Sequence, residues 1–163
     1  KVYGITLEGK LAWRNKWQLQ AGMTMQRAQY KESRSWDNGG VDKEKRMFRT
    51  PDTYGYFTMT YSPVKAFNIA LSGTYTGSML IEHHSGYIAA NRTEKTNQFL
   101  DMTLKASYDF ALYKNTTLQL NVGLNNIFND YQSDFDKGAD RDSGYIYGPG
   151  IPRSFFAGIK ISY

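Results

Sequence analysis

Two adjacent histidines, His83 and His84, are the only imidazole side chains in the sequence. Successive side chains of an extended segment point to opposite sides, so this pair is poorly placed to share one metal ion. One of them could ligate iron, haem or cobalt with help from another loop, and the alternative is a solvated polar pair. The sequence has no cysteine and no recognisable Ser-His-Asp arrangement, so we expect neither enzymatic activity nor a bound cofactor.

A second group with metal-binding chemistry is the acidic segment DFDKGADRD at residues 134–142. Its alternating carboxylates are hard oxygen ligands that could bind calcium. The segment departs from the EF-hand pattern, because Gly138, Ala139 and Tyr145 stand where that loop needs Asp or Asn, then glycine and glutamate. Lys137 and Arg141 also neutralise part of the charge, so a charge-balanced surface loop is the alternative. The candidate metal ligands are Asp134, Asp136, Asp140 and Asp142.

Aromatic and cationic side chains occur in the same kind of polar, glycine-rich segment. Such residues suit an anionic or aromatic chelate, through stacking and charge. They equally suit contact with lipopolysaccharide or simple packing of the loops. Together with the two histidines, the candidate ligand-binding residues are Trp36, Arg49, His83, His84, Tyr87, Arg92, Tyr145 and Tyr147.

The composition favours strands over helices. Aromatic residues make up 15% of the chain, with 13 tyrosines among them, and aromatic residues are enriched in strands. No run of about 18 apolar residues occurs, which excludes a membrane-spanning helix but not membrane strands, whose alternation averages to mild hydropathy. The formal charge is +5, but the basic residues are scattered and their densest cluster, VDKEKRMFR, is mixed in sign. This distribution argues against nucleic-acid binding.

Seven stretches alternate apolar and polar residues with the period of a β-strand. In the last one, Phe155, Ile159 and Tyr163 share one face, whereas Ser154 and Lys160 lie on the other. Most stretches are about ten residues long, enough to cross the roughly 25 Å apolar band of an outer membrane when tilted. We therefore predict an all-β protein, an antiparallel up-and-down meander of about seven long strands that forms part of a transmembrane β-barrel. The predicted strands are residues 3–13, 17–26, 55–62, 67–76, 99–110, 117–126 and 154–163.

The connections between these stretches alternate between short and long. The short ones are residues 14–16, 62–65 and 112–115, and the long, polar ones are residues 31–51, 77–95 and 128–150. A meander places alternate connections at opposite ends of its sheet. Outer-membrane barrels have short periplasmic turns and long extracellular loops, so the sorting predicts that the two ends face different environments.

Aromatic residues on the predicted apolar face lie within a residue or two of the short turns. Aromatic side chains in this position form the belts that anchor a barrel at the headgroup level. The alternative is that they fill the core of a β-sandwich. The predicted membrane-anchor residues are Trp13, Trp17, Tyr61, Phe67, Phe110 and Tyr163, and Tyr3, Tyr75 and Phe155 could form the opposite belt.

Two stretches resemble motifs near the end of TonB-dependent outer-membrane receptors. GLNNIFNDYQ, at residues 123–132, resembles the family's Asn-Leu/Ile-Phe-Asp/Asn signature, which is followed closely by a tyrosine. GPGIPRSFFAGIKISY, at residues 148–163, resembles the family's final strand, with serine in place of the commoner threonine and tyrosine in place of the commoner terminal phenylalanine. The matching residues are Asn126, Ile127, Phe128, Asn129, Tyr131, Pro152, Arg153, Ser154, Phe155 and Tyr163.

The resemblance implies a barrel of about 22 strands with an internal plug, of which this chain would supply the last seven strands. It implies a location in the bacterial outer membrane, with long loops outside and short turns in the periplasm. The implied partners are membrane lipid and lipopolysaccharide, the rest of the barrel and its plug, TonB through the missing N-terminal region, and the barrel-assembly machinery through the last strand. An odd number of strands cannot close the usual single-chain bacterial barrel, and the chain begins at Lys1 without an initiator methionine, so we expect a piece of a longer protein.

The function implied by the resemblance is active import of a scarce nutrient chelate, such as a ferric siderophore, haem or cobalamin. Two alternatives stay open. One is a passive outer-membrane channel or an adhesin barrel, and the other is a soluble β-sandwich or lipocalin-like binding domain. Specificity in this fold depends on the loops and the plug together, so the sequence does not identify the ligand.

Overall fold

The computed structural model describes residues 1–35 and 43–163, and every regular element in them is a strand. In this part of the chain, no helix is long and apolar enough to cross a membrane. The strands are β1 (Val2–Trp13), β2 (Trp17–Arg34), β3 (Glu44–Arg46), β4 (Thr53–Val64), β5 (Phe67–Thr76), β6 (Leu80–His83), β7 (Arg92–Lys95), β8 (Phe99–Ala111), β9 (Thr117–Asn125) and β10 (Ser154–Ser162).

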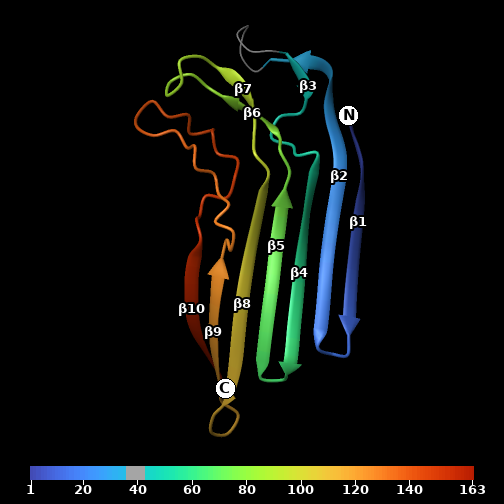
Figure 1. The fold of residues 1–163 in the computed structure, drawn as a ribbon, viewed down its shortest axis with the longest axis vertical. Coiled ribbons are helices and arrows are strands. Elements are labelled where there is room, and N and C mark those ends of the chain that lie inside the picture. The colour runs from blue at the N-terminus through green and yellow to red at the C-terminus, as the bar shows by residue number, and fades with distance from the viewer. Residues whose placement is uncertain (36–42) are drawn as a thin grey trace.

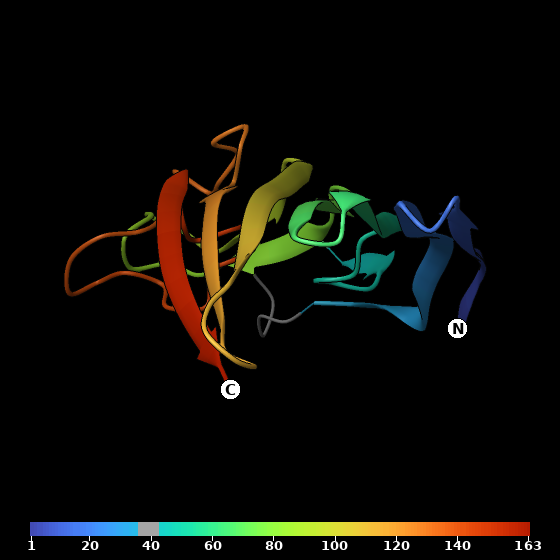
Figure 2. The ribbon, with the colours of Figure 1, turned by 90° about the horizontal axis from the view of Figure 1, so that it is seen from below.

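Seven long strands form one antiparallel sheet in the order β1-β2-β4-β5-β8-β9-β10, which is also their order in the sequence. The tight turns lie at one end of the sheet and the long connections at the other (Figure 1). The predicted all-β fold and the up-and-down strand order are therefore confirmed. Within the described residues, β1 pairs only with β2 and β10 only with β9, and these two strands lie at opposite ends of the sheet (Figure 2).

The structure adds short strands that the sequence did not predict. β2 continues to Arg34, well past the predicted end, and its extension pairs with the short strand β3. The long connection between β5 and β8 contains a separate hairpin, in which β6 and β7 pair antiparallel. These elements project beyond the main sheet at its long-loop end (Figure 1).

The register of the strands aligns apolar residues with apolar residues across the whole sheet. Because side chains alternate between faces, a row of directly paired residues keeps one chemical character from edge to edge. One such row is Leu11, Leu19, Met59, Leu71, Leu104, Leu124 and Phe155. On the opposite face, a polar row runs through Lys10, Gln20, Thr58, Ser72, Thr103, Asn125 and Ser154.

The side chains of the apolar face are exposed on the outer strands and half-buried on β4 and β5. Leu7, Ile159 and Phe155 are 70%, 72% and 82% exposed, respectively. The buried apolar side chains of the described residues lie instead towards the long-loop end, and they are Ala28, Phe48, Ile81, Phe99 and Tyr145. The small core of this chain therefore sits between the long loops and the adjoining ends of the strands.

Candidate functional site

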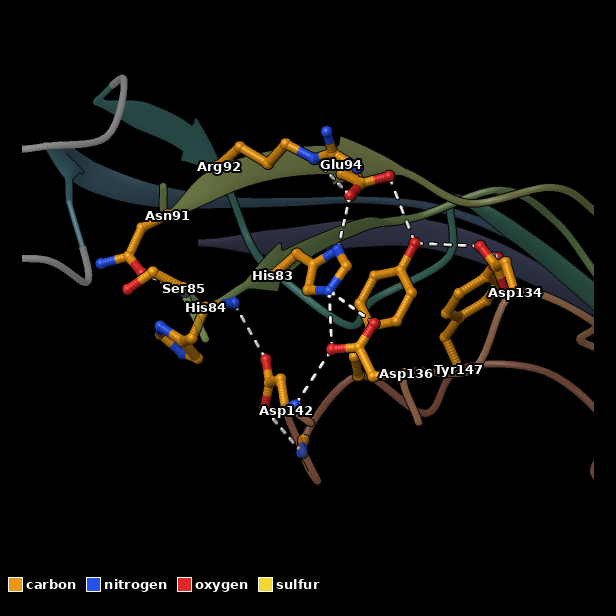
Figure 3. Close-up of polar contacts among 12 residues, drawn as sticks. His83, His84, Ser85, Asn91, Arg92, Glu94, Asp134, Asp136, Asp142 and Tyr147 are labelled. Carbon is orange, nitrogen blue, oxygen red and sulfur yellow. Dashed lines mark hydrogen bonds and ion pairs between the residues drawn. The ribbon is translucent and has the colours of Figure 1, made fainter. Parts of the chain in front are cut away.

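A dense polar cluster joins the β6–β7 hairpin to the long loop between β9 and β10 (Figure 3). Strand pairing places Ile81 opposite Glu94 and His83 opposite Arg92, so these four side chains share one face of the hairpin. Ile81 is fully buried and fixes this face against the rest of the structure. The hairpin thereby directs His83 towards the loop that carries the acidic segment.

His83 is held between two carboxylates. Its Nδ1 lies 2.7 Å from Oε1 of Glu94, and its Nε2 lies 3.0 and 2.9 Å from the two carboxylate oxygens of Asp136. An ionised carboxylate only accepts hydrogen bonds, so this arrangement favours the doubly protonated, positively charged imidazolium. His83 is 3% exposed and Asp136 9%, so water has little access to the pair. Charge-assisted hydrogen bonds in this setting stabilise the junction between hairpin and loop.

Tyr145 covers the imidazole and extends the network. Its ring stacks on His83 with centroids 3.6 Å apart and an interplanar angle of 13°. Its hydroxyl lies 3.2 Å from Oε2 of Glu94 and 3.0 Å from Oδ2 of Asp134. The hydroxyl of Tyr147 donates to the same Asp134 oxygen over 2.7 Å. The carboxylates of Glu94, Asp134 and Asp136 thus accept hydrogen bonds from one cationic ring and two phenol hydroxyls.

Asp142 and Asp136 also shape the loop backbone. The Asp142 backbone N–H donates to Oδ2 of Asp136 over 3.0 Å, and the Asp142 carboxylate accepts from the backbone N–H groups of His84 and Gly144. Backbone donors of both loops are therefore satisfied by carboxylates from the acidic segment. The segment acts as a structural connector in this arrangement.

The environment of each group shifts its pKa. Burial alone lowers the pKa of His83, but hydrogen bonds to Glu94 and Asp136 outweigh that effect and raise it. Burial opposes the ionised forms of Glu94 and Asp134, yet hydrogen bonds from His83 and Arg92 to Glu94, and from the two tyrosines to Asp134, lower both pKa values. Burial and the nearby Asp134 carboxylate raise the pKa of both phenols, which stay neutral donors.

Two further side chains fix the β9–β10 loop. Arg49, from the first long loop, donates Nη1–H to the carbonyl of Ile146 over 3.1 Å. Gln132 is 1% exposed, donates to the Tyr145 carbonyl over 3.0 Å and accepts from the Tyr147 N–H over 2.8 Å. All three long connections therefore contribute to one assembly.

The residues that resemble the family signature close the base of the same loop. Asn126 is 2% exposed, and its Nδ2 donates to the carbonyls of Asp130 and Ile151 while its Oδ1 accepts from the Asp130 N–H. Asn129 accepts from the Arg153 N–H over 2.9 Å. Both asparagines have positive φ angles, 48° and 56°, a conformation that asparagine tolerates better than most residues. The signature thus ties the beginning of the loop to its end.

Some of the predicted ligand-binding residues are used in the loop network, and others are exposed to solvent. His83 and Tyr145 are buried inside the loop network, and Arg49 is used for the loop contacts described above. The His84 side chain is 50% exposed, on the opposite side from His83, and Tyr87 is 54% exposed. Arg92 is exposed and forms an ion pair with Glu94, Tyr147 is half-buried, and Trp36 lies outside the described residues.

The four predicted calcium ligands do not converge. Asp134 binds the tyrosine hydroxyls, Asp136 binds His83, Asp142 binds backbone N–H groups, and Asp140 is exposed. Across the described ranges, no three acidic, histidine or cysteine side chains are grouped as a metal site would require. Calcium binding by this loop stays a prediction.

The predicted membrane-anchor residues lie together at the tight-turn end of the apolar face. Trp13 pairs with Trp17, whose ring stacks on Tyr61 at 4.1 Å. Further along the sheet, Phe67 contacts Tyr108, and Tyr108 contacts Phe110 at 4.7 Å. Tyr163 follows β10 at the same end and is fully exposed.

Glu94, Gln132 and Asp130 are site residues that sequence reasoning did not identify. Gln132 and Glu94 lie in polar stretches without periodicity, so the sequence carried no signal that either would be drawn into the loop network. Asp130 accepts from the Leu100 N–H over 2.9 Å. Its position directly after the asparagine signature is a feature of the sequence that could have indicated its role.

Comparisons with protein-family models and with curated proteins found no match to this chain.

Proposed function

We propose that this chain is a seven-stranded part of the barrel wall of a TonB-dependent outer-membrane receptor. The observation that carries the proposal is the two-sided sheet, whose wholly apolar row crosses all seven long strands. Four of the seven side chains in this row are exposed, and the other three are half-buried. Burying such a face in lipid removes a large apolar area from water, at about 25 cal/mol per Å². A β-sandwich would instead cover this face with a second sheet.

The aromatic belt supports the same proposal. The rings from Trp17 to Phe110 line one level of the apolar face, next to the tight turns, as the headgroup region of a bilayer requires. The opposite face is polar and carries internal hydrogen bonds such as Gln119 to Asp109 and Tyr56 to Glu8. That face would line the interior of the barrel and meet its plug.

The open edges agree with a part of a larger barrel. Backbone groups of β1 and β10 that face away from the sheet need partners, because lipid offers no hydrogen bonds. The remaining strands of the receptor would supply those partners. The three long connections would then face the cell exterior, where they would contribute to recognition of a nutrient chelate such as a ferric siderophore, haem or cobalamin.

Flotation with lipid vesicles tests the membrane assignment. The chain is refolded from denaturant in the presence of phospholipid vesicles or in plain buffer, and each sample is examined by density-gradient centrifugation and far-UV circular dichroism. We expect the chain to float with the vesicles, because its apolar face leaves water there, and to aggregate in plain buffer, where that face and both edges stay in water. A monodisperse β-rich monomer in plain buffer would overturn the proposal.

A further inference from the structure

A small cleft opens between the β9–β10 loop and the polar face of the sheet, at the long-loop end. Its volume is about 260 Å³, below the range of roughly 300–1,000 Å³ that encloses whole small ligands, so it suits one chemical group of a larger molecule. The floor comes from β5 and β8, and the roof comes from the loop. The lining residues are Thr74, Thr76, Phe99, Asp101, Tyr147, Gly148 and Pro149.

Three polar side chains that line this cleft, Thr74, Thr76 and Asp101, have no polar partner among the described residues. Asp101 pairs with Thr74, and Phe99 with Thr76, across neighbouring strands, so their side chains share the polar face. In the described chain, the Asp101 carboxylate and both threonine hydroxyls make no hydrogen bond or ion pair with another residue. By contrast, Asp109 on the same face of β8 accepts a hydrogen bond from Gln119 at 2.7 Å. Asp101 is therefore the carboxylate of this strand that is left for an outside partner.

Aromatic rings form the walls of the cleft, and the loop holds them in place. Phe99 is 5% exposed, and its ring centroid lies 5.8 Å from that of Tyr147. A Cβ added to Gly148 would come within 2.6 Å of the Phe99 ring, so glycine lets the loop approach this closely. Gln132 Oε1 accepts from the backbone N–H groups of Tyr147 and Gly148, and Asp134 fixes the Tyr147 hydroxyl. The cleft is thus formed before any ligand arrives.

The charges of the side chains that line the cleft favour a cationic group over an anionic one. The cleft contains one carboxylate and no basic side chain, and the nearest lysine along the same face of β8, Lys105, is four residues from Asp101, roughly 13 Å along a strand. Aromatic faces attract cations, and hydroxyl oxygens accept hydrogen bonds from ammonium protons. An anionic group would be repelled by Asp101.

We propose that this cleft binds the ammonium group of an amine-bearing ligand, with Asp101 as the counter-ion and Phe99 and Tyr147 as aromatic walls. The inference rests on the proposed function only in assigning that amine to the imported molecule. It narrows the cargo to chelates or other nutrients that carry a protonated amine on the part that enters the barrel mouth.

The test uses the refolded full chain in detergent micelles and three probes of similar size, n-butylammonium, n-butanol and butyrate, with binding followed by NMR chemical shifts. We expect n-butylammonium to shift resonances of Phe99, Thr76 and Gly148, with butanol and butyrate at least about tenfold weaker. Asp101→Asn should weaken ammonium binding by about tenfold or more, whereas Asp109→Asn, a matched loss of charge on the same face, should leave it unchanged.

Equal binding of the ammonium and the alcohol, no binding of either, or equal effects of the two substitutions would each overturn the proposal. Unchanged circular dichroism and unchanged resonances of the β1–β2 region confirm that both variants are folded. The vesicle flotation experiment involves no residue of the cleft, so failure of the ammonium site and failure of the membrane assignment are seen separately.

Discussion

The imidazole Nε2 of His83 and the carboxylate Oδ2 of Asp136 lie 2.9 Å apart, although 53 residues separate them in the sequence. One residue ends a short hairpin strand and the other belongs to the loop between the last two strands. Their contact, completed by Glu94 and the stacked Tyr145 ring, joins the connection between β5 and β8 to the connection between β9 and β10.

Replacing His83 should loosen both loops. His83→Gln removes the buried cation and leaves the Asp136 carboxylate without its cationic partner, and breaking one side of a buried ion pair costs about 3 kcal/mol or more. We expect amide exchange in residues 80–95 and 128–150 to speed up about 100-fold, measured by hydrogen–deuterium exchange on the refolded chain. His84→Gln, at an exposed neighbouring position, is the control and should change little. Equal protection in both variants would contradict the contact.

The junction should depend on pH in two directions. The folded-state pKa of His83 is raised, so its contribution is complete below the unfolded value of 6.5 and is lost as pH rises through the folded pKa. The folded-state pKa values of Glu94 and Asp134 are lowered, so their contribution is present above about pH 4.5 and is lost as pH falls through those values. The loops should be most protected between these limits. NMR titration of the His83 ring should give a midpoint above 6.5 that falls in Asp136→Asn.

Asn126 should contribute more to loop closure than Asn129. Asn126→Gly keeps the positive φ accessible but deletes three hydrogen bonds, about 3 kcal/mol at about 1 kcal/mol each. Asn129→Gly deletes one, so it should cost about 1 kcal/mol. Limited proteolysis of the loop between β9 and β10 measures the difference. A larger effect at Asn129 would mean that the side-chain contacts of Asn126 do not hold the loop base.

A charge should destabilise the protein much more on one face of β5 than on the other. Leu71 belongs to the apolar row, and arginine near the centre of a lipid-facing band costs roughly 2–4 kcal/mol. Ser72 is the next residue and belongs to the polar row, so Ser72→Arg should cost much less. Urea unfolding of vesicle-inserted protein compares the two variants. Equal destabilisation would argue that the apolar face does not meet lipid.

The sheet could be predicted well from the sequence, because the alternation that specifies each strand lies within that strand. Alternation in stretches such as residues 67–76 specifies a strand, its two faces and its neighbours without reference to distant residues. The loop network could not be predicted in the same way. His83, Glu94 and Asp136 come from segments without periodicity, and only the folded backbone brings them together. Proximity in sequence suggested instead that the four aspartates would act as a group.

The two edge strands, β1 and β10, both run from the long-loop end to the tight-turn end, since six antiparallel pairings separate them. If β1 of one copy paired with β10 of another, with the apolar faces of both copies on the same side, the two strands would therefore have to be parallel. Like edges could pair antiparallel across a twofold axis, but that symmetry would invert one copy and place its aromatic belt at the level of its neighbour's long loops. In the proposed membrane location, the two chemically different sides of the bilayer would oppose such an inversion. An all-antiparallel closure of the sheet, from β10 back to β1, would therefore need an odd number of further strands.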